Sequence, residues 1–180
     1  MRKSIFTLAA VSAAALTLSA CGNEAADADG DGEISAEEAS DAMSDIKMTP
    51  GEYEVKASFT EIEVEGMPEA AKKAMLDQMG NVPAQKMCVT EEMAANPGAG
   101  MFGGAEESGC TMDKLERSGS DMEVAMTCKV GEMSVVSNME GTMEAESYTM
   151  NIEQTMTGGP TGDMKMKGTV EGKRVGDCPA

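Results

Sequence analysis

The chain has 180 residues, of which 32 are Asp or Glu, 14 are Lys or Arg and none is His, and its formal net charge is −18. A chain this acidic repels nucleic acid and anionic lipid headgroups and attracts cations. Without His it cannot build Ser–His or Cys–His catalytic pairs, nor a zinc or iron site that uses His. We therefore expect a protein that is not an enzyme and does not bind nucleic acid.

Residues 1–20 predict an export signal. Arg2 and Lys3 precede an apolar run over residues 5–18, which is too short to span a bilayer as a stable anchor. Cys21 follows Leu18-Ser19-Ala20, a sequence that resembles a bacterial lipobox. The resemblance implies cleavage before Cys21 and acylation of this residue, and more than one acyl chain gives durable membrane anchoring.

The alternative for Cys21 is an ordinary secretory signal followed by a fifth disulfide cysteine. We favour the lipid anchor, because Cys21 is the odd one of five cysteines and lies where the apolar run stops. The expected location is the cell envelope, facing the periplasm. Gly22 and Asn23 follow the cysteine, and by resemblance to enterobacterial sorting signals they favour the outer membrane.

The segment DADGDGEISAEE, residues 27–38, matches the EF-hand calcium loop at every ligand position. Calcium prefers about six to eight oxygen ligands. Gly32 permits the sharp turn of such a loop, and Ile34 is the apolar residue that makes a short strand contact in paired loops. The expected ligands are the carboxylates of Asp27, Asp29, Asp31 and Glu38, the backbone carbonyl of Glu33, and the hydroxyl of Ser35 or a water that it holds.

The loop departs from the EF-hand family in its surroundings. Residues 22–26 are too few for an entering helix, there is no second loop, and only an exit helix over residues 36–46 is expected. The predicted site is therefore weak, with a dissociation constant of about 10⁻⁴–10⁻³ M, as in extracellular modules. It lies in an acidic flexible tether over residues 21–47, where calcium would act locally and leave the β domain unchanged. The alternative is an acidic leader that matches the pattern by chance.

From residue 48 onward, alternation of apolar and polar residues predicts a mainly β domain over residues 48–180. Tyr53 and Phe59 share one face of the first strand, and a change of phase near residues 60–61 indicates a bulge. Short turns between successive strands predict an antiparallel meander, as an open sheet or a half-barrel. Further strands are expected at 85–90, 122–130, 133–139, 141–145, 148–156 and 163–174, with one short helix at 68–79 and a Gly-rich loop at 96–108.

Four cysteines remain besides Cys21, and an exported protein should oxidise them. Three pairings are possible. Cys110 and Cys128 lie symmetrically about Gly119, in a turn-like SGSD sequence between two alternating runs, so a hairpin would bring them together. That leaves Cys88 to pair with Cys178. Because no CxxC spacing occurs, we expect structural disulfides.

Several short motifs together resemble a proteobacterial exported family, the domain of unknown function 3617. They are MTPGEYEV at residues 48–55, CVT at 88–90, SYTM at 147–150 and KRVGDC at 173–178, with Cys110 and Cys128 between them. The resemblance covers about residues 46–178 and departs from the family in having Tyr53 where Trp is typical. The family carries no assigned activity, so the resemblance implies an exported compartment and the β fold but no catalytic residue.

The chain has nineteen methionines. Most lie on the inward phase of the predicted strands, where Met is an adaptable core residue. The alternative function is a soft-metal or oxidant-buffering protein, since thioethers favour Cu(I) and Met164 with Met166, or Met139 with Met143, could offer two sulfurs. A third use is to bind an apolar ligand in a Met-lined half-barrel.

Overall fold

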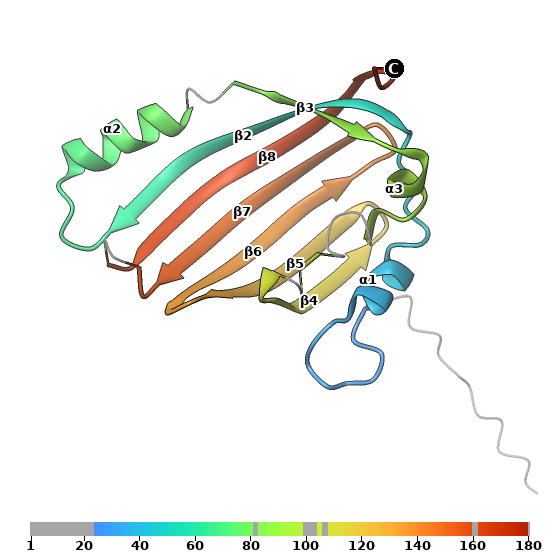
Figure 1. Ribbon diagram of the computed structural model, residues 1–180, viewed down its shortest axis with the longest axis horizontal. Coiled ribbons are helices and arrows are strands. Elements are labelled where there is room, and N and C mark those ends of the chain that lie inside the picture. Colours follow the sequence, from blue (N-terminus) through green and yellow to red (C-terminus); the bar gives the residue numbers. More distant parts are fainter. Residues whose placement is uncertain (1–23, 81–82, 99–103, 106–107, 160–161, 180) are drawn as a thin grey trace, which may run out of the picture.

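The computed structural model describes residues 24–80, 83–98, 104–105, 108–159 and 162–179, so the predicted export signal and Cys21 lie outside the described residues. One antiparallel sheet dominates (Figure 1), with the strand order β1-β4-β5-β6-β7-β8-β2-β3. The strands are β1 (Glu24–Ala25), β2 (Gly51–Val64), β3 (Gln85–Val89), β4 (Cys110–Ser118), β5 (Asp121–Val130), β6 (Met133–Met143), β7 (Ser147–Thr157) and β8 (Met164–Gly176). The helices are α1 (Ala36–Ala42), α2 (Glu69–Gly80) and α3 (Glu91–Ala95).

Strands β4 to β8 follow one another through short turns, and β2 then pairs with β8. Gly119 and Gly131 turn the β4–β5 and β5–β6 connections with φ of +63° and +64°, a conformation that glycine adopts at little cost. The sheet ends at β1 and β3 and is open. The mainly β, antiparallel fold predicted from the sequence is confirmed. Among the described helices, none is long and apolar enough to cross a bilayer.

The local predictions agree with the structure at some positions and differ from it at others. β6 runs unbroken where two strands were expected, because Gly141 lies inside it and not in a turn; a Cβ at this position would clash with the Thr149 carbonyl of β7. The predicted bulge in β2 is confirmed by a register shift between Phe59 and Glu61. α2 lies one residue from its predicted bounds. α3 was not expected; the Thr90 hydroxyl caps it by accepting from the Met93 N–H at 3.2 Å.

Both disulfides predicted from the sequence are present. Cys110 and Cys128 are directly opposite in the β4–β5 register and are bonded, with their Cα atoms 3.9 Å apart. Cys88 in β3 is bonded to Cys178, which follows β8, with a Cα–Cα distance of 5.5 Å. The second bond ties the end of the chain to the edge of the sheet.

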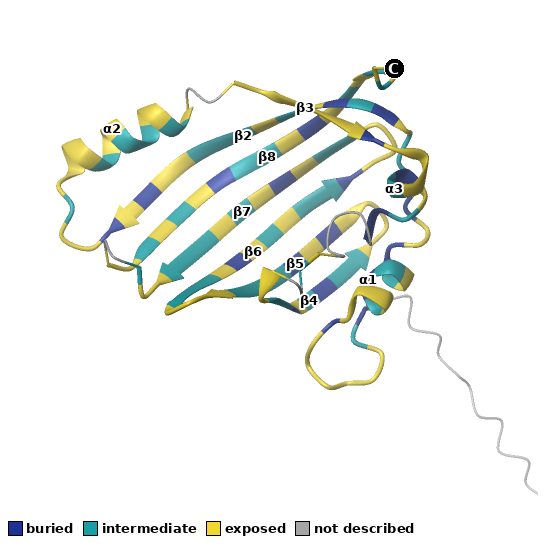
Figure 2. Cartoon of the chain, in the orientation of Figure 1, coloured by how far each residue is buried: buried dark blue, intermediate teal, exposed yellow. Residues whose placement is uncertain are grey.

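The two faces of the sheet differ in polarity. Buried and exposed segments alternate along the strands (Figure 2), as expected when successive side chains point to opposite faces. Tyr53 at the start of β2 is fully buried, and its hydroxyl donates to the carbonyls of Thr49 and Ala145 at 2.9 and 3.0 Å. The opposite face carries ion pairs between neighbouring strands, such as Lys167 with Glu153 at 2.8 Å.

The segment before β2 does not behave as the flexible tether predicted from the sequence. Ala39 and Met43 are fully buried, and they belong to the same apolar cluster as residues of the sheet. α1 and the residues after it therefore cover one end of the apolar face of the sheet. The cluster comprises Ala26, Ile34, Ala39, Met43 and Ile46 from this segment with Met112, Leu115, Met122, Val124, Met143 and Met150 from the sheet.

Candidate metal centre

The acidic loop at residues 27–38 connects β1 to α1 and turns sharply through two glycines. Gly30 and Gly32 have φ of +74° and +86°, which residues with a side chain rarely adopt. The Asp27 carboxylate holds the turn, because it accepts from the N–H of Gly30 at 2.7 Å and of Gly32 at 3.2 Å. The glycine that the EF-hand pattern requires is thus at the turn.

Glu38 connects the two ends of this loop. It lies in the first turn of α1 and forms a capping box with Ser35. Its carboxylate accepts from the N–H groups of Ser35 and Ala28, both at 2.9 Å. These hydrogen bonds, the one from the Ser35 N–H above all, hold the pKa of the Glu38 carboxyl below its ordinary value of 4.5. Glu38 is therefore ionised at neutral pH, and the contribution of these hydrogen bonds is lost only as the pH falls through the lowered pKa.

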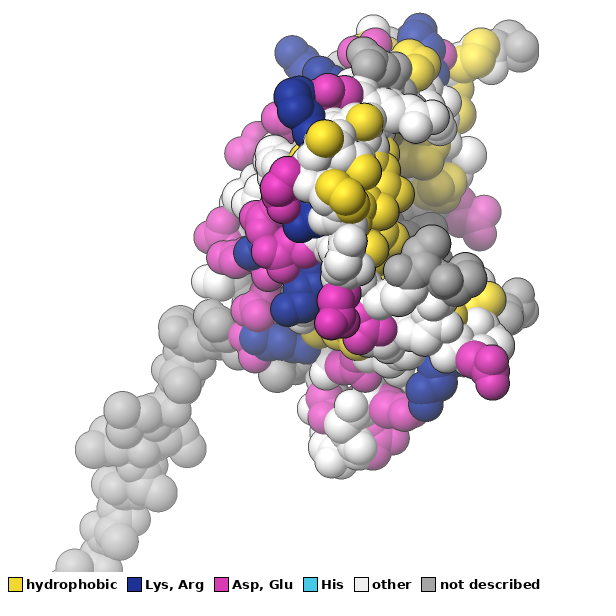
Figure 3. All heavy atoms as spheres, turned by 90° about the vertical axis from the view of Figure 1, so that its left-hand side faces the viewer, with side chains coloured by type: hydrophobic (Ala, Val, Ile, Leu, Met, Phe, Trp, Pro, Cys, Tyr) yellow, Lys and Arg dark blue, Asp and Glu magenta, His cyan; other side chains and the backbone are white. Residues whose placement is uncertain are grey.

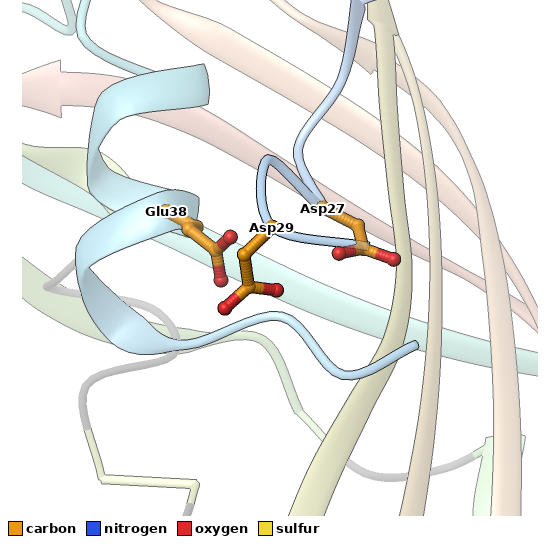
Figure 4. A group of neighbouring side chains, drawn as sticks. All are labelled: Asp27, Asp29 and Glu38. Atoms are coloured by element: carbon orange, nitrogen blue, oxygen red, sulfur yellow. The ribbon is translucent and has the colours of Figure 1, made fainter. Parts of the chain in front are cut away.

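Three carboxylates converge in the loop. Asp27, Asp29 and Glu38 each offer an oxygen, and these oxygens lie within 4.8 Å of one another. In Figure 4, Glu38 extends from α1 toward Asp29, and Asp27 lies on the adjoining part of the loop. Negative groups this close repel one another, and a hard cation with several free coordination positions relieves that repulsion.

The other expected ligands lie beside this group. Asp31, Glu33 and Ser35 line the hollow that Asp29 and Glu38 also line. The Asp31 carboxylate accepts from the Glu33 N–H at 2.8 Å, and it is not one of the three converging groups. Three of the six predicted ligand residues therefore converge in the structure. The other three line the hollow beside them.

Three further residues line the hollow: Glu37, which the sequence places beside the ligand carboxylates, and Asp41 and Thr111, which sequence reasoning did not identify. Glu37 and Asp41 lie on α1, on the turn of helix next to Glu38. Thr111 comes from β4, far away in the chain, and no local pattern around it indicates proximity to the loop.

The loop is attached to β4 of the sheet just before its start and again at Ile34. Ala26 N–H donates to the Leu115 carbonyl at 3.0 Å, and Ile34 N–H donates to the Met112 carbonyl at 2.8 Å. The Ile34 side chain is buried in the shared core. In a paired EF-hand the corresponding residue meets a second calcium loop; here β4 takes the place of that partner.

The methionines named as possible copper ligands lie within the apolar face. Met143 is buried and Met139 packs against the same core cluster. Met164 and Met166 are half-buried at the start of β8. Their positions match the use of Met as an adaptable apolar residue.

The comparisons with known proteins identify the sheet but not the loop. A family model described as "Protein of unknown function (DUF3617)" matches residues 48–178. The chain matches no curated protein and no solved structure. The matched region begins after α1, so the candidate metal centre precedes it in sequence. Because the match spans most of the chain, the protein belongs to the DUF3617 family of proteins of unknown function.

Proposed function

We propose that this protein is a non-enzymatic lipoprotein of the cell envelope whose loop at residues 27–38 binds one calcium ion. The observation that carries the calcium proposal is the convergence of Asp27, Asp29 and Glu38 within 4.8 Å in a loop whose sequence has the EF-hand spacing. A binding or structural role for the sheet fits a family without an assigned activity.

The proposed ligand roles combine the EF-hand spacing with the geometry of the loop. Asp27 and Asp29 supply carboxylates from the entry of the loop, and Glu38 supplies one from the first turn of α1. Asp31, Glu33 and Ser35, which line the same hollow, complete an oxygen shell through a carboxylate, a backbone carbonyl and a hydroxyl or bound water. An all-oxygen set of this kind suits calcium.

Calorimetry on the protein should detect one calcium site with a dissociation constant of about 10⁻⁴–10⁻³ M. Asp27→Ala and Glu38→Gln should each abolish the binding heat, because each removes one of the three converging carboxylates. Glu132→Gln is the matched control: it removes the same charge from the exposed β5–β6 turn, away from the loop, and should leave binding within about twofold. Equal losses in the Glu132 and Glu38 variants, or no heat at millimolar calcium, would show that the loop is an acidic spacer.

The lipid anchor is supported by the sequence around Cys21. If Cys21 is the acylated first residue, only Gly22 and Asn23 separate it from β1, which begins at Glu24. The proposed anchor would then hold the sheet and the calcium loop close to the membrane surface. The expected orientation is toward the periplasm, with the outer membrane favoured.

Cys21→Ser should convert a membrane-bound protein that partitions into detergent into one that is uncleaved or misprocessed. Fractionation and mass measurement of the N-terminal peptide check this result, with Ser4→Ala inside the signal as the control that should retain anchoring. A Cys21→Ser protein that matures normally and fractionates like the parent would refute the lipoprotein proposal and leave the calcium proposal standing.

A further inference from the structure

The apolar face of the sheet continues well beyond the part that α1 covers. Strand register places six half-buried residues together on this face, toward the end of the sheet opposite α1. We call them the distal apolar face: Phe59, Val135, Ile152, Met156, Met164 and Met166. None of the six belongs to either buried cluster of the core.

The described helices lie to the side of this face. α1 packs beside β4 and α2 beside β2, and neither is placed across β6, β7 and β8. Figure 3 views the molecule from this end, where α2 also lies, and shows hydrophobic side chains gathered along one side of it. On β2, Ile62 and Val64 lie opposite Met166 and Met164 and are only 4% and 6% exposed, and α2 packs beside this strand. Over β6, β7 and β8, none of the described helices gives the distal apolar face the cover that α1 gives to the other end.

Polar groups within the distal apolar face satisfy one another. Its two polar side chains, Ser137 and Gln154, lie on neighbouring strands, and the Gln154 amide donates to the Ser137 hydroxyl at 3.1 Å. Along the described parts of β5 to β8, the charged residue that alternates onto this face is Arg174, opposite Tyr53 at the other end of the sheet, and the distal positions carry none. The face therefore offers apolar contact and no demand for a polar or charged partner group.

The covered end of the same face indicates what kind of segment fits it. There α1 and the residues after it present Ala39, Met43 and Ile46, an apolar stripe at helical spacing, to the strands. A helix satisfies its own backbone hydrogen bonds, whereas an extended peptide laid on an apolar surface would leave polar backbone groups unpaired. Because the distal apolar face continues the surface that already takes a helix, it fits a second one.

The charge of the protein indicates which kind of partner can bind to the distal apolar face. The ends of the strands around the distal apolar face carry exposed Glu65, Glu132 and Asp163 beside exposed Lys129 and Lys165, and the whole chain is strongly acidic, with a net charge of −18. A second copy of the chain and an anionic lipid would both be repelled. We propose that the distal apolar face binds the apolar stripe of an amphipathic helix from another protein, and that basic residues flank this stripe.

A dye-labelled, 18-residue helix of Leu and Lys with one apolar stripe is the probe, and fluorescence anisotropy with residues 22–180 is the measurement. This part contains both partners of every hydrogen bond and disulfide described above. Binding should be saturable, and an isomer with Glu in place of Lys should bind at least tenfold more weakly. Met156→Glu should weaken binding of the Leu–Lys helix at least tenfold, because it places a carboxylate between Met164 and Val135 on this face.

The matched control is Val136→Glu, which adds the same charge on the opposite face, where Val136 is 38% exposed; it should leave binding within about twofold. Met166→Glu repeats the test on a neighbouring strand if Met156→Glu lowers the melting temperature. Equal losses in the Val136 and Met156 variants, or equal binding of the Leu–Lys and Leu–Glu helices, overturn the proposal. So does an acyl-chain dye or self-association that occupies the face while the helix fails to bind.

Discussion

Replacing Met43 with Ala is expected to lower the free energy of unfolding of the whole protein by about 2–5 kcal/mol, the range for removal of a fully buried large side chain. Met43 follows α1, is 0% exposed, and lies in the cluster that also contains Leu115 and Val124 of the sheet. Urea denaturation followed by far-ultraviolet circular dichroism measures this loss. The transition should remain single, because the segment and the sheet share one core.

Met87→Ala is the control for this substitution. Met87 lies on the edge strand β3 and is 42% exposed, so its truncation should change the unfolding free energy by less than about 1 kcal/mol. If Met43→Ala were as mild as Met87→Ala, residues 24–47 would be a tether after all. A separate early transition that leaves the sheet signal intact would have the same meaning.

Much of the sheet could be predicted because its determinants are local. Alternation in β5 and β8 and the turn at Gly119 are visible in a few residues, and the symmetric spacing of Cys110 and Cys128 about that turn indicates their pairing. Gly141 led to the wrong prediction of two strands in place of β6, because glycine is common in turns. Here it is required by the close approach of the Thr149 carbonyl on a neighbouring strand, which no local pattern contains.

The candidate site was likewise predictable from the sequence only in part. Asp27, Asp29 and Glu38 could be named from the EF-hand spacing, since the pattern itself encodes which oxygens face the ion. The docking of the loop on β4 could not be predicted, because the loop binds the Met112 and Leu115 carbonyls, which are backbone groups distant in the chain. Backbone acceptors leave no signature in the side-chain sequence.

The apolar stripe after the loop can be recognised in the sequence, but its docking on the sheet cannot be predicted from the sequence. Ala39, Met43 and Ile46 have the spacing of an apolar helix face, yet a stripe this short is compatible with a solvated tether as well as with docking. What decides between them is the sheet, whose apolar face needs cover at that end. The structure thus joins a segment outside the matched family region to the core of the family domain.

Calcium is expected to raise the melting temperature of the entire sheet, contrary to the local effect predicted from the sequence. A ligand that binds only the folded state, at about 100 times its dissociation constant, stabilises that state by about 2.7 kcal/mol. For a domain of this size that corresponds to about 5–10 °C. The effect reaches the sheet because the N–H groups of Ala26, before the loop, and Ile34, within it, donate to β4, and because Ile34 lies in the shared core.

Thermal melting of residues 22–180 with calcium and with a chelator measures this shift. Glu38→Gln should remove the shift, and Glu132→Gln in the β5–β6 turn should retain it, because only Glu38 belongs to the converging carboxylates. The shift should also fade as the pH falls through the lowered pKa of Glu38, where protonation withdraws a ligand. If calorimetry detects calcium while the melting of the sheet stays unchanged, the loop must open independently of β4, and the two hydrogen bonds to that strand do not couple calcium to the fold.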